Sequence, residues 1–205
     1  APTWAKGDGG DREAKSFYDD ALLESVYKAL NGQADLQVAF VLAVNIGPRA
    51  IDLFSLRWEQ VRLDRERPAI EYTARKTGKT QLAPLGDVTV AQINRWRRVS
   101  AVLIDEGPLF PDLTDLGSSD PERSRTARRR NARFKKALAT LDIKHRKPWQ
   151  VARLTCNERL ERHCPGAGQF MLGHSSTLNS VSYREPSGLV FEAVTTLPQP
   201  ECFRV

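Results

Sequence analysis

The sequence predicts a mostly α-helical fold with a small antiparallel β-sheet (α+β). Apolar residues recur at helical spacing over most of the chain, as in Leu22, Val26 and Leu30. Only a few short segments, all between residues 61 and 84, have the composition and turn signals of strands. Hydrophobic residues make up 40% of the 205 residues, which is enough for one sizeable core. We therefore expect one domain over residues 19–198, with a flexible lead-in at 1–18 and a C-terminal tail at 199–205.

The expected elements follow from periodicity and from breaks at glycine and proline. The segment 34–45 is almost entirely apolar and predicts a buried helix, after which Gly47-Pro48 breaks the chain before a short helix over 52–56. Strands are expected at 61–63, 70–74 and 81–84, and the last two flank a hairpin tip. Further helices are expected at 19–31, 87–104, 122–141, 149–162, 166–172, 176–184 and 187–195.

The positive charge is concentrated in one segment. The net charge is +6, yet Arg123–Lys147 holds eleven Lys or Arg and one acid, against 20 Lys or Arg and 24 acids elsewhere. Phe134, Leu138 and Leu141 recur there at helical spacing, so one face can dock on the core while the other stays exposed. Such a segment is typical of proteins that bind a polyanion, although a merely solvated face is the alternative. The expected nucleic-acid-binding residues are Arg128, Arg129, Arg130, Arg133 and Lys136.

Several classes of protein are disfavoured by what the sequence lacks. The three cysteines form no CxxC pair, which indicates a reducing compartment, and we expect the cytoplasm, in association with the nucleoid. The longest apolar run, residues 38–44, is too short to span a bilayer. Histidines and cysteines show no ligand spacing, so no metal site is expected. Gly78-Lys79-Thr80 resembles the end of a phosphate-binding loop, but Thr73 stands where that loop needs glycine, so no nucleotide cofactor is expected.

Four blocks along the chain carry polar residues that suit chemistry at phosphorus. They are Gly-Pro-Arg-Ala-Ile-Asp-Leu-Phe-Ser-Leu-Arg-Trp (47–58), Arg-Lys-Thr-Gly-Lys-Thr (75–80), Val-Ala-Arg-Leu-Thr (151–155), and Met-Leu-Gly-His-Ser-Ser (171–176) followed by Tyr183. In order and spacing they resemble the catalytic domain of the tyrosine recombinases, the phage-integrase family. The resemblance runs from about residue 19 to about residue 195, and it is most specific around Arg49 and over His174–Tyr183.

The resemblance implies a set of catalytic roles. Arg49 and Arg153 stabilise the charged non-bridging oxygens of a phosphodiester, because a guanidinium presents a planar fork of donors and stays charged. His174 is a third donor to those oxygens. Tyr183 attacks phosphorus and forms a covalent phosphotyrosine, releasing a 5′ hydroxyl.

The remaining role is protonation of the leaving oxygen. The family pattern assigns it to Lys76 at the hairpin tip, with Lys79 as the alternative. Asp52, one helical turn after Arg49, is expected to orient this lysine. None of these roles needs a metal or a cofactor, and rejoining needs no ATP because the phosphotyrosine keeps the energy of the cleaved bond.

One departure from the family pattern affects the expected activity. Similar proteins usually carry histidine three residues before the second arginine, and this chain has Gln150 there. Glutamine hydrogen-bonds but accepts no proton at neutral pH, so the role of general base is in doubt. A register shifted by one residue, with Trp149 opposite the histidine and Ala152 opposite the arginine, loses the match at Thr155.

The resemblance implies site-specific recombination of double-stranded DNA through a 3′-phosphotyrosine intermediate. The alternatives are DNA relaxation like that of type IB topoisomerases and a DNA-binding protein of the same fold with impaired catalysis. Self-association into a synapse on DNA is expected, with a monomer in its absence and no membrane partner. Because the chain begins at Ala1 and its only methionine is Met171, we expect a longer protein with a further DNA-binding domain before this one.

Overall fold

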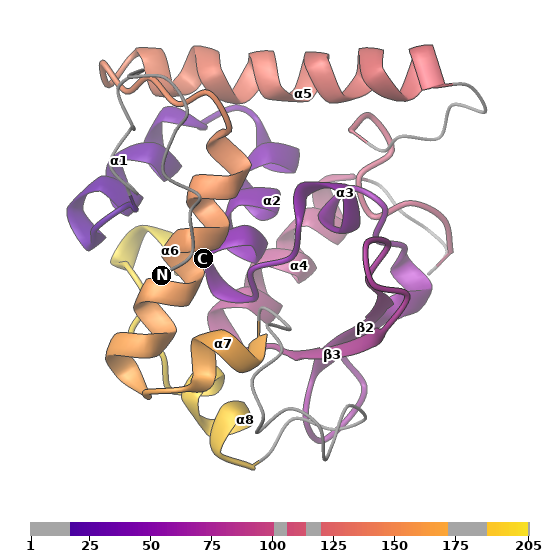
Figure 1. The fold of residues 1–205 in the computed structure, drawn as a ribbon, viewed down its shortest axis with the longest axis vertical. Coiled ribbons are helices and arrows are strands. Elements are labelled where there is room, and N and C mark those ends of the chain that lie inside the picture. Colours follow the sequence, from indigo (N-terminus) through magenta and orange to yellow (C-terminus); the bar gives the residue numbers. More distant parts are fainter. Residues whose placement is uncertain (1–16, 101–105, 114–119, 172–187, 205) are drawn as a thin grey trace, which may run out of the picture.

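A computed structural model describes residues 17–100, 106–113, 120–171 and 188–204. Over these ranges the chain is mostly helical, with a three-stranded antiparallel sheet at one side of a helical body (Figure 1). The predicted fold class is therefore confirmed. The helices are α1 (Asp20–Ala29), α2 (Ala34–Asn45), α3 (Ala50–Leu53), α4 (Asp87–Val99), α5 (Asp120–Ala139), α6 (Pro148–His163), α7 (Ala167–Met171) and α8 (Gly188–Thr195), with 3₁₀ turns η1 (Trp58–Gln60) and η3 (Glu201–Phe203).

Helix α2 forms the centre of the core. Residues 36–45 are all buried, as expected of a helix that is apolar on every side. Helices α4 and α6 pack against it. The ring of Phe40 lies 5.8 Å from the ring of Tyr18 before α1, 5.8 Å from Phe134 of α5 and 6.3 Å from Phe203 of η3. One aromatic cluster thus joins the two ends of the described chain through α2.

The last two strands of the sheet form a hairpin. The strands of the sheet, β1 (Val61–Arg62), β2 (Ala69–Thr73) and β3 (Thr80–Pro84), lie in the order β1-β2-β3. Tyr72 faces the core and Thr73 faces solvent, as the alternation of a half-buried strand requires. Between β2 and β3 the chain turns through Gly78, whose φ of 65° favours glycine. Residues 75–80 at this tip are exposed.

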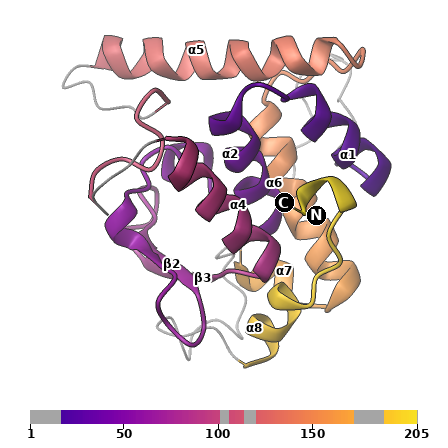
Figure 2. The ribbon, with the colours of Figure 1, turned by 180° about the vertical axis from the view of Figure 1, so that it is seen from behind.

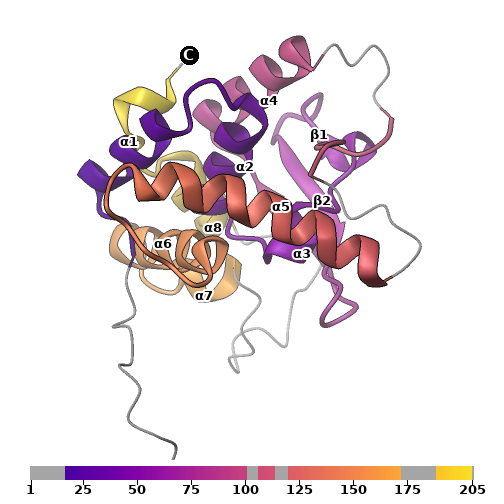
Figure 3. The ribbon, with the colours of Figure 1, turned by 90° about the horizontal axis from the view of Figure 1, so that it is seen from above.

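Helix α5 crosses one end of the molecule, over α2, α3 and α6 (Figures 1 and 3). Phe134 and Leu138, two of the three residues predicted to dock this helix, are fully buried, and the third, Leu141, is half-buried just after the helix ends. Phe134 also packs on Trp149 of α6, with ring centroids 4.4 Å apart. The basic helix is therefore held by one apolar side, as its periodicity predicted.

The last described residues pack on the core. Seen from behind, the chain after α8 returns to α1 and ends in η3 (Figure 2). Phe203 is fully buried, and Gln92 of α4 donates a 2.7 Å hydrogen bond to its carbonyl oxygen. The part of the expected tail that the structure describes, residues 199–204, is thus an integral part of the fold.

The predicted elements agree with the structure in type and order. The helix expected at 34–45 is found with those bounds. The helix expected over 87–104 ends at Val99, and residues 101–105 lie outside the described ranges, as does the helix expected at 176–184. Both 3₁₀ turns were missed. None of the described helices is long and apolar enough to cross a membrane.

Candidate active site

The first arginine block bends the chain at the end of α2. Gly47 has a φ of 59°, and Pro48 follows it, so the chain leaves α2 at an angle and restarts as the short helix α3. Arg49 caps the start of α3 with extended backbone angles, and its carbonyl oxygen accepts from the amides of Asp52 and Leu53 at 2.9 and 2.8 Å. The Arg49 side chain is half-buried. The predicted break and short helix therefore place this guanidinium at the edge of the core.

The second arginine is brought to the first by a contact between distant parts of the chain. Arg153 of α6 donates a hydrogen bond to the carbonyl oxygen of Gly47. Burial lowers the pKa of the Arg153 guanidinium, and the nearby positive charge of Arg49 lowers it further. Two cations near enough to interact favour binding of an anion between them, because the anion offsets their mutual repulsion. The structure thus brings together the two arginines that the sequence predicted as partners.

Asp52 connects the arginine block to the hairpin. Its side chain is 2% exposed, and its Oδ1 atom accepts a 2.9 Å hydrogen bond from the backbone amide of Arg75. The sequence predicted that this carboxylate orients the hairpin lysine. The contact observed is with the backbone of the residue before Lys76, so Asp52 fixes the base of the tip.

The hairpin tip is closed by its own backbone. The amide of Ala74 donates to the carbonyl of Lys79 at 2.9 Å, and the amide of Gly78 donates to the carbonyl of Ala74 at 2.8 Å. Lys76 is exposed in this closed turn. The side chain of Lys76 is thus exposed to solvent, whereas the backbone of its turn is fixed by hydrogen bonds.

Burial bears on the register around the second arginine. Gln150 lies in the first turn of α6 and is exposed, one helical turn before Arg153. Trp149 and Ala152 are 4% and 0% exposed, and the Trp149 ring packs 4.9 Å from Phe54. A register shifted by one residue would place core side chains in the site. Burial therefore favours Gln150 and Arg153 as the matched positions.

Two predicted catalytic residues fall outside the described part of the chain. His174 and Tyr183 both lie between residues 172 and 187. Helix α7 ends just before this segment and packs on α6, and α8 begins just after it and contacts α6, α7 and β3. The helices before and after the segment therefore both pack on α6, the helix that carries Arg153.

Two residues expected to contact nucleic acid have partners within the protein, and the burial of the first corrects its assignment. Arg130 is 5% exposed, donates to the carbonyl of Leu113 at 3.1 Å and lies with its guanidinium 4.4 Å from the ring centroid of Phe54. Arg133 makes a two-pronged ion pair with Asp35, at 2.6 and 2.9 Å. Both lie at the side of α5 that faces the protein. Among the side chains of the segment that the structure describes, the exposed cations are Arg125, Arg128, Arg129, Lys135, Lys136, Lys144, Arg146 and Lys147.

The buried position of Arg130 leads to a prediction on stability. Arg130→Ala removes a buried cation–ring contact and leaves the Leu113 carbonyl without this donor, so the free energy of unfolding should fall by about 2–3 kcal/mol. Urea denaturation measures this decrease. The matched control is Arg129→Ala at the exposed neighbouring position, which should change stability by less than about 0.5 kcal/mol. Equal effects of the two substitutions would contradict the buried role.

Arg159 is a residue that the sequence interpretation missed. It is 9% exposed on α6 and donates to Asn45 Oδ1 at 2.7 Å, to the Val44 carbonyl at 3.2 Å and to the Pro198 carbonyl. It therefore ties the end of α2 to the segment that follows α8. A signal was present, because Arg159 follows Ala152 and Cys156 by seven and three residues and so shares their buried face.

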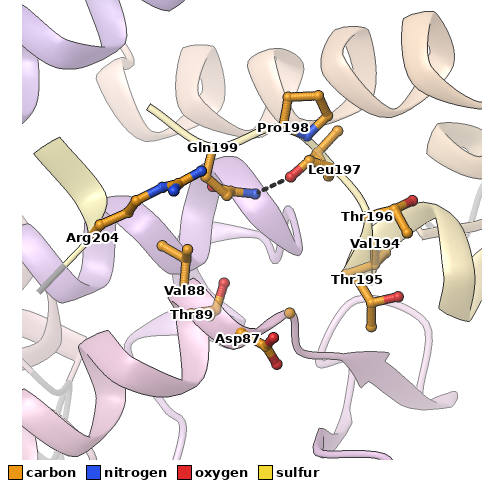
Figure 4. A pocket seen from close by; sticks show the side chains of 11 residues that line it. Asp87, Val88, Thr89, Val194, Thr195, Thr196, Leu197, Pro198, Gln199 and Arg204 are labelled. Carbon is orange, nitrogen blue, oxygen red and sulfur yellow. Dashed lines mark hydrogen bonds between the residues drawn. The ribbon is translucent and has the colours of Figure 1, made fainter. Parts of the chain in front are cut away.

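No described group of residues is arranged to hold a metal ion. A cavity of about 400 Å³ lies between the start of α4 and the segment after α8 (Figure 4). Its walls include Asp87, Thr195 and Arg204, and none of the candidate catalytic residues lines it. The candidate residues lie instead on α3 and its first-turn boundary, on α6 and on the hairpin.

Comparisons with known proteins bear on the fold. No protein-family profile and no curated protein matches the sequence. Solved structures do match. A lambda integrase (75–356) dimer bound to a COC′ core site has a TM-score of 0.58 at 16% identity, over 87% of this chain and 63% of that one. The lambda integrase catalytic core has a TM-score of 0.56 at 16% identity, over 77% and 90%. XerA recombinase has a TM-score of 0.58 at 16% identity, over 94% and 62%. The chain thus spans less than two thirds of the lambda integrase 75–356 chain and of XerA.

Proposed function

We propose that the protein is a site-specific DNA recombinase, because its fold is that of a tyrosine recombinase catalytic domain. The observation that carries the proposal is the contact between Arg153 and the Gly47 carbonyl, which holds the second guanidinium two residues from Arg49, near enough for the two charges to interact. Beside that pair, Asp52 holds the base of a hairpin with an exposed lysine at its tip. A paired cation and a separate proton donor are what in-line cleavage of a phosphodiester requires.

In the proposed reaction the two arginines bind the non-bridging oxygens of the scissile phosphate. The charge on these oxygens grows in the transition state, so preorganised guanidiniums stabilise it more than the ground state. His174 adds a third donor. Gln150, one turn before Arg153, donates its amide to the phosphate but accepts no proton.

Tyr183 is the proposed nucleophile. Its oxygen forms a bond to phosphorus, the bond from phosphorus to the 5′ oxygen breaks, and Lys76 gives a proton to that oxygen. Water or His174 takes the phenol proton. Burial supports this choice, because the other three of the four tyrosines, Tyr18, Tyr27 and Tyr72, are at most 5% exposed. A phenol enclosed in the core does not reach DNA.

The proposed substrate is double-stranded DNA held partly by the exposed cations of α5. Structural neighbours include a lambda integrase tetramer bound to a Holliday junction and XerH bound to its difH substrate. By analogy, we infer that this protein assembles with further copies on DNA and is a monomer without it. Strand exchange needs such an assembly, because each copy cleaves one strand.

The proposal is tested by covalent capture. The 205-residue chain is incubated with a library of nicked duplexes of randomised sequence, in which cleavage beside the nick frees a short strand and blocks rejoining. A protein–DNA adduct that survives denaturing electrophoresis, recovered on a subset of sequences, supports a site-specific recombinase. Binding without any adduct would favour a DNA-binding protein of this fold that has lost catalysis, an outcome that the glutamine at position 150 makes worth testing.

The exposed basic face leads to a prediction on salt dependence. Replacing Arg128, Arg129 and Lys136 with alanine should make the slope of log K against log salt shallower, by roughly one unit for each phosphate that these side chains neutralise in the wild-type complex. Arg62, Arg65 and Arg98 are exposed outside the segment and serve as a control with the same change in charge. An equal flattening in both triple variants would show that net charge alone, and not this face, sets the slope.

A further inference from the structure

Tyr72 is a buried tyrosine whose partner lies directly across the hairpin. It sits on β2 opposite Gln81 of β3 in the strand register, and its side chain is 5% exposed. Its hydroxyl donates a 2.6 Å hydrogen bond to Gln81 Oε1. The contact therefore links the two strands on the side of the sheet that faces the candidate site.

The surroundings of Tyr72 contain the charged groups of the candidate site. Burial raises the pKa of its phenol, the negative charge of Asp52 raises it further, and the positive charges of Arg153 and Arg49 act in the opposite direction. Asp52, Arg153 and Arg49 are thus close enough for their charges to change the pKa of this phenol. Because the phenol stays protonated, it remains a hydrogen-bond donor throughout the working pH range.

Two hydrogen bonds involve residues on either side of the hairpin tip. On the first strand, the Arg75 amide donates to Asp52 Oδ1 at 2.9 Å. On the second strand, Gln81 is bonded to Tyr72 of the first strand, whose buried side chain lies near the charged residues of the candidate site. Lys76 lies in the tip between these attachments. The backbone ladder already joins β2 to β3, and the Tyr72 bond adds a tie between the second strand and a buried side chain. A small displacement of a reacting group costs much of its catalytic contribution.

We infer that Tyr72 is a positioning residue for the hairpin lysine, holding the returning strand through Gln81 so that Lys76 reaches the leaving oxygen. The inference rests on the proposed recombinase function and deepens it. It concerns the protonation of the leaving group only. The arginine pair should act on the phosphate whether or not the Tyr72 hydroxyl is present.

The test compares two leaving groups in Tyr72→Phe. One substrate is a nicked duplex recovered by covalent capture, and the other carries sulfur in place of the bridging 5′ oxygen at the scissile phosphate. A thiolate leaves without being protonated, so its release does not depend on the lysine. Tyr72→Phe should slow cleavage of the oxygen substrate by roughly 10- to 100-fold and that of the sulfur substrate by less than about threefold. In a Lys76→Ala background, the same change should have little effect on the oxygen substrate.

The matched control is Tyr27→Phe. Tyr27 is 5% exposed, accepts hydrogen bonds from Gln92 and Arg95, and belongs to the α1–α4 contact away from the hairpin. This variant should cleave both substrates at the wild-type rate. Equal slowing of the oxygen and sulfur substrates by Tyr72→Phe would overturn the inference, because it would show a general effect on the site.

A second measurement separates this inference from the proposed function. If the wild-type chain cleaves neither substrate, the proposed function fails, and hydrogen exchange of the hairpin amides still tests the positioning role. Tyr72→Phe should then speed exchange at residues 74–80 and leave α2 unchanged. Unchanged exchange over the hairpin would overturn the inference, and faster exchange would support it without any cleavage.

Discussion

Tyr183→Phe is expected to abolish covalent capture of DNA while leaving the fold and DNA binding intact. The substitution removes one oxygen atom, which is the atom that bonds to phosphorus in the proposed reaction. No phosphotyrosine forms without it, so the adduct band on a denaturing gel should fall below detection. Fluorescence anisotropy on the same duplex should show affinity within about twofold of wild type, because contacts to the phosphates hold the DNA.

The control for this result is Tyr27→Phe, which removes the hydroxyl of a buried tyrosine and should retain full capture. Its urea unfolding midpoint, and that of Tyr183→Phe, should show that each variant is folded. Adduct formation by a folded Tyr183→Phe variant would mean that another side chain attacks phosphorus. Mass spectrometry of the adduct peptide would then identify the residue.

Gln150→His is expected to speed cleavage near neutral pH. With glutamine at this position the site lacks the base that similar proteins usually carry there, so the wild-type rate should rise with pH until an unperturbed phenol ionises near pH 10. An imidazole has an unperturbed pKa of about 6.5 and accepts the proton once it is neutral. The variant should therefore be faster at pH 7 by at most roughly 10²–10⁴-fold, the usual contribution of a positioned general base.

The pH profile distinguishes a base from a merely better hydrogen-bonding group. The rate of Gln150→His should rise up to about pH 6.5 and then level off, and it should meet the wild-type rate at high pH, where the phenol ionises unaided. Gln150→Ala should slow cleavage modestly at every pH. Trp149→His should lower stability without any gain in rate, because Trp149 is 4% exposed in the core. A gain in rate for Trp149→His alone would move the register by one residue and remove the assignment of Arg153.

Much of the candidate site was predictable because its parts are local. The apolar run at 34–45 specifies a buried helix, and Gly47-Pro48 ends it, so Arg49 had to stand at the start of the next element. Likewise, alternating residues on either side of Gly78 specify a hairpin with Lys76 at its tip. Patterns of this kind depend on neighbours within a few residues.

In the basic helix α5, local patterns did not predict the burial of one arginine. Phe134 and Leu138 correctly predicted its buried side, and Arg130, four residues before Phe134, belongs to the same series. An arginine is usually assigned to the exposed side because burying its charge is costly. Here the ring of Phe54 and the carbonyl of Leu113 stabilise the buried guanidinium, and neither partner is a neighbour in the sequence.

The sequence by itself determined the type and order of the described α-helices and strands, the buried side of α5, and the placement of Arg49 at a helix start and of Lys76 at the hairpin tip. Only the tertiary structure decided which of these residues meet. Arg153 reaches the carbonyl of Gly47 across 106 residues, and Asp52 reaches the hairpin across 23. Helical and strand periods describe a residue's own element, whereas a site is formed by contacts between elements, which depend on how their apolar faces pack together.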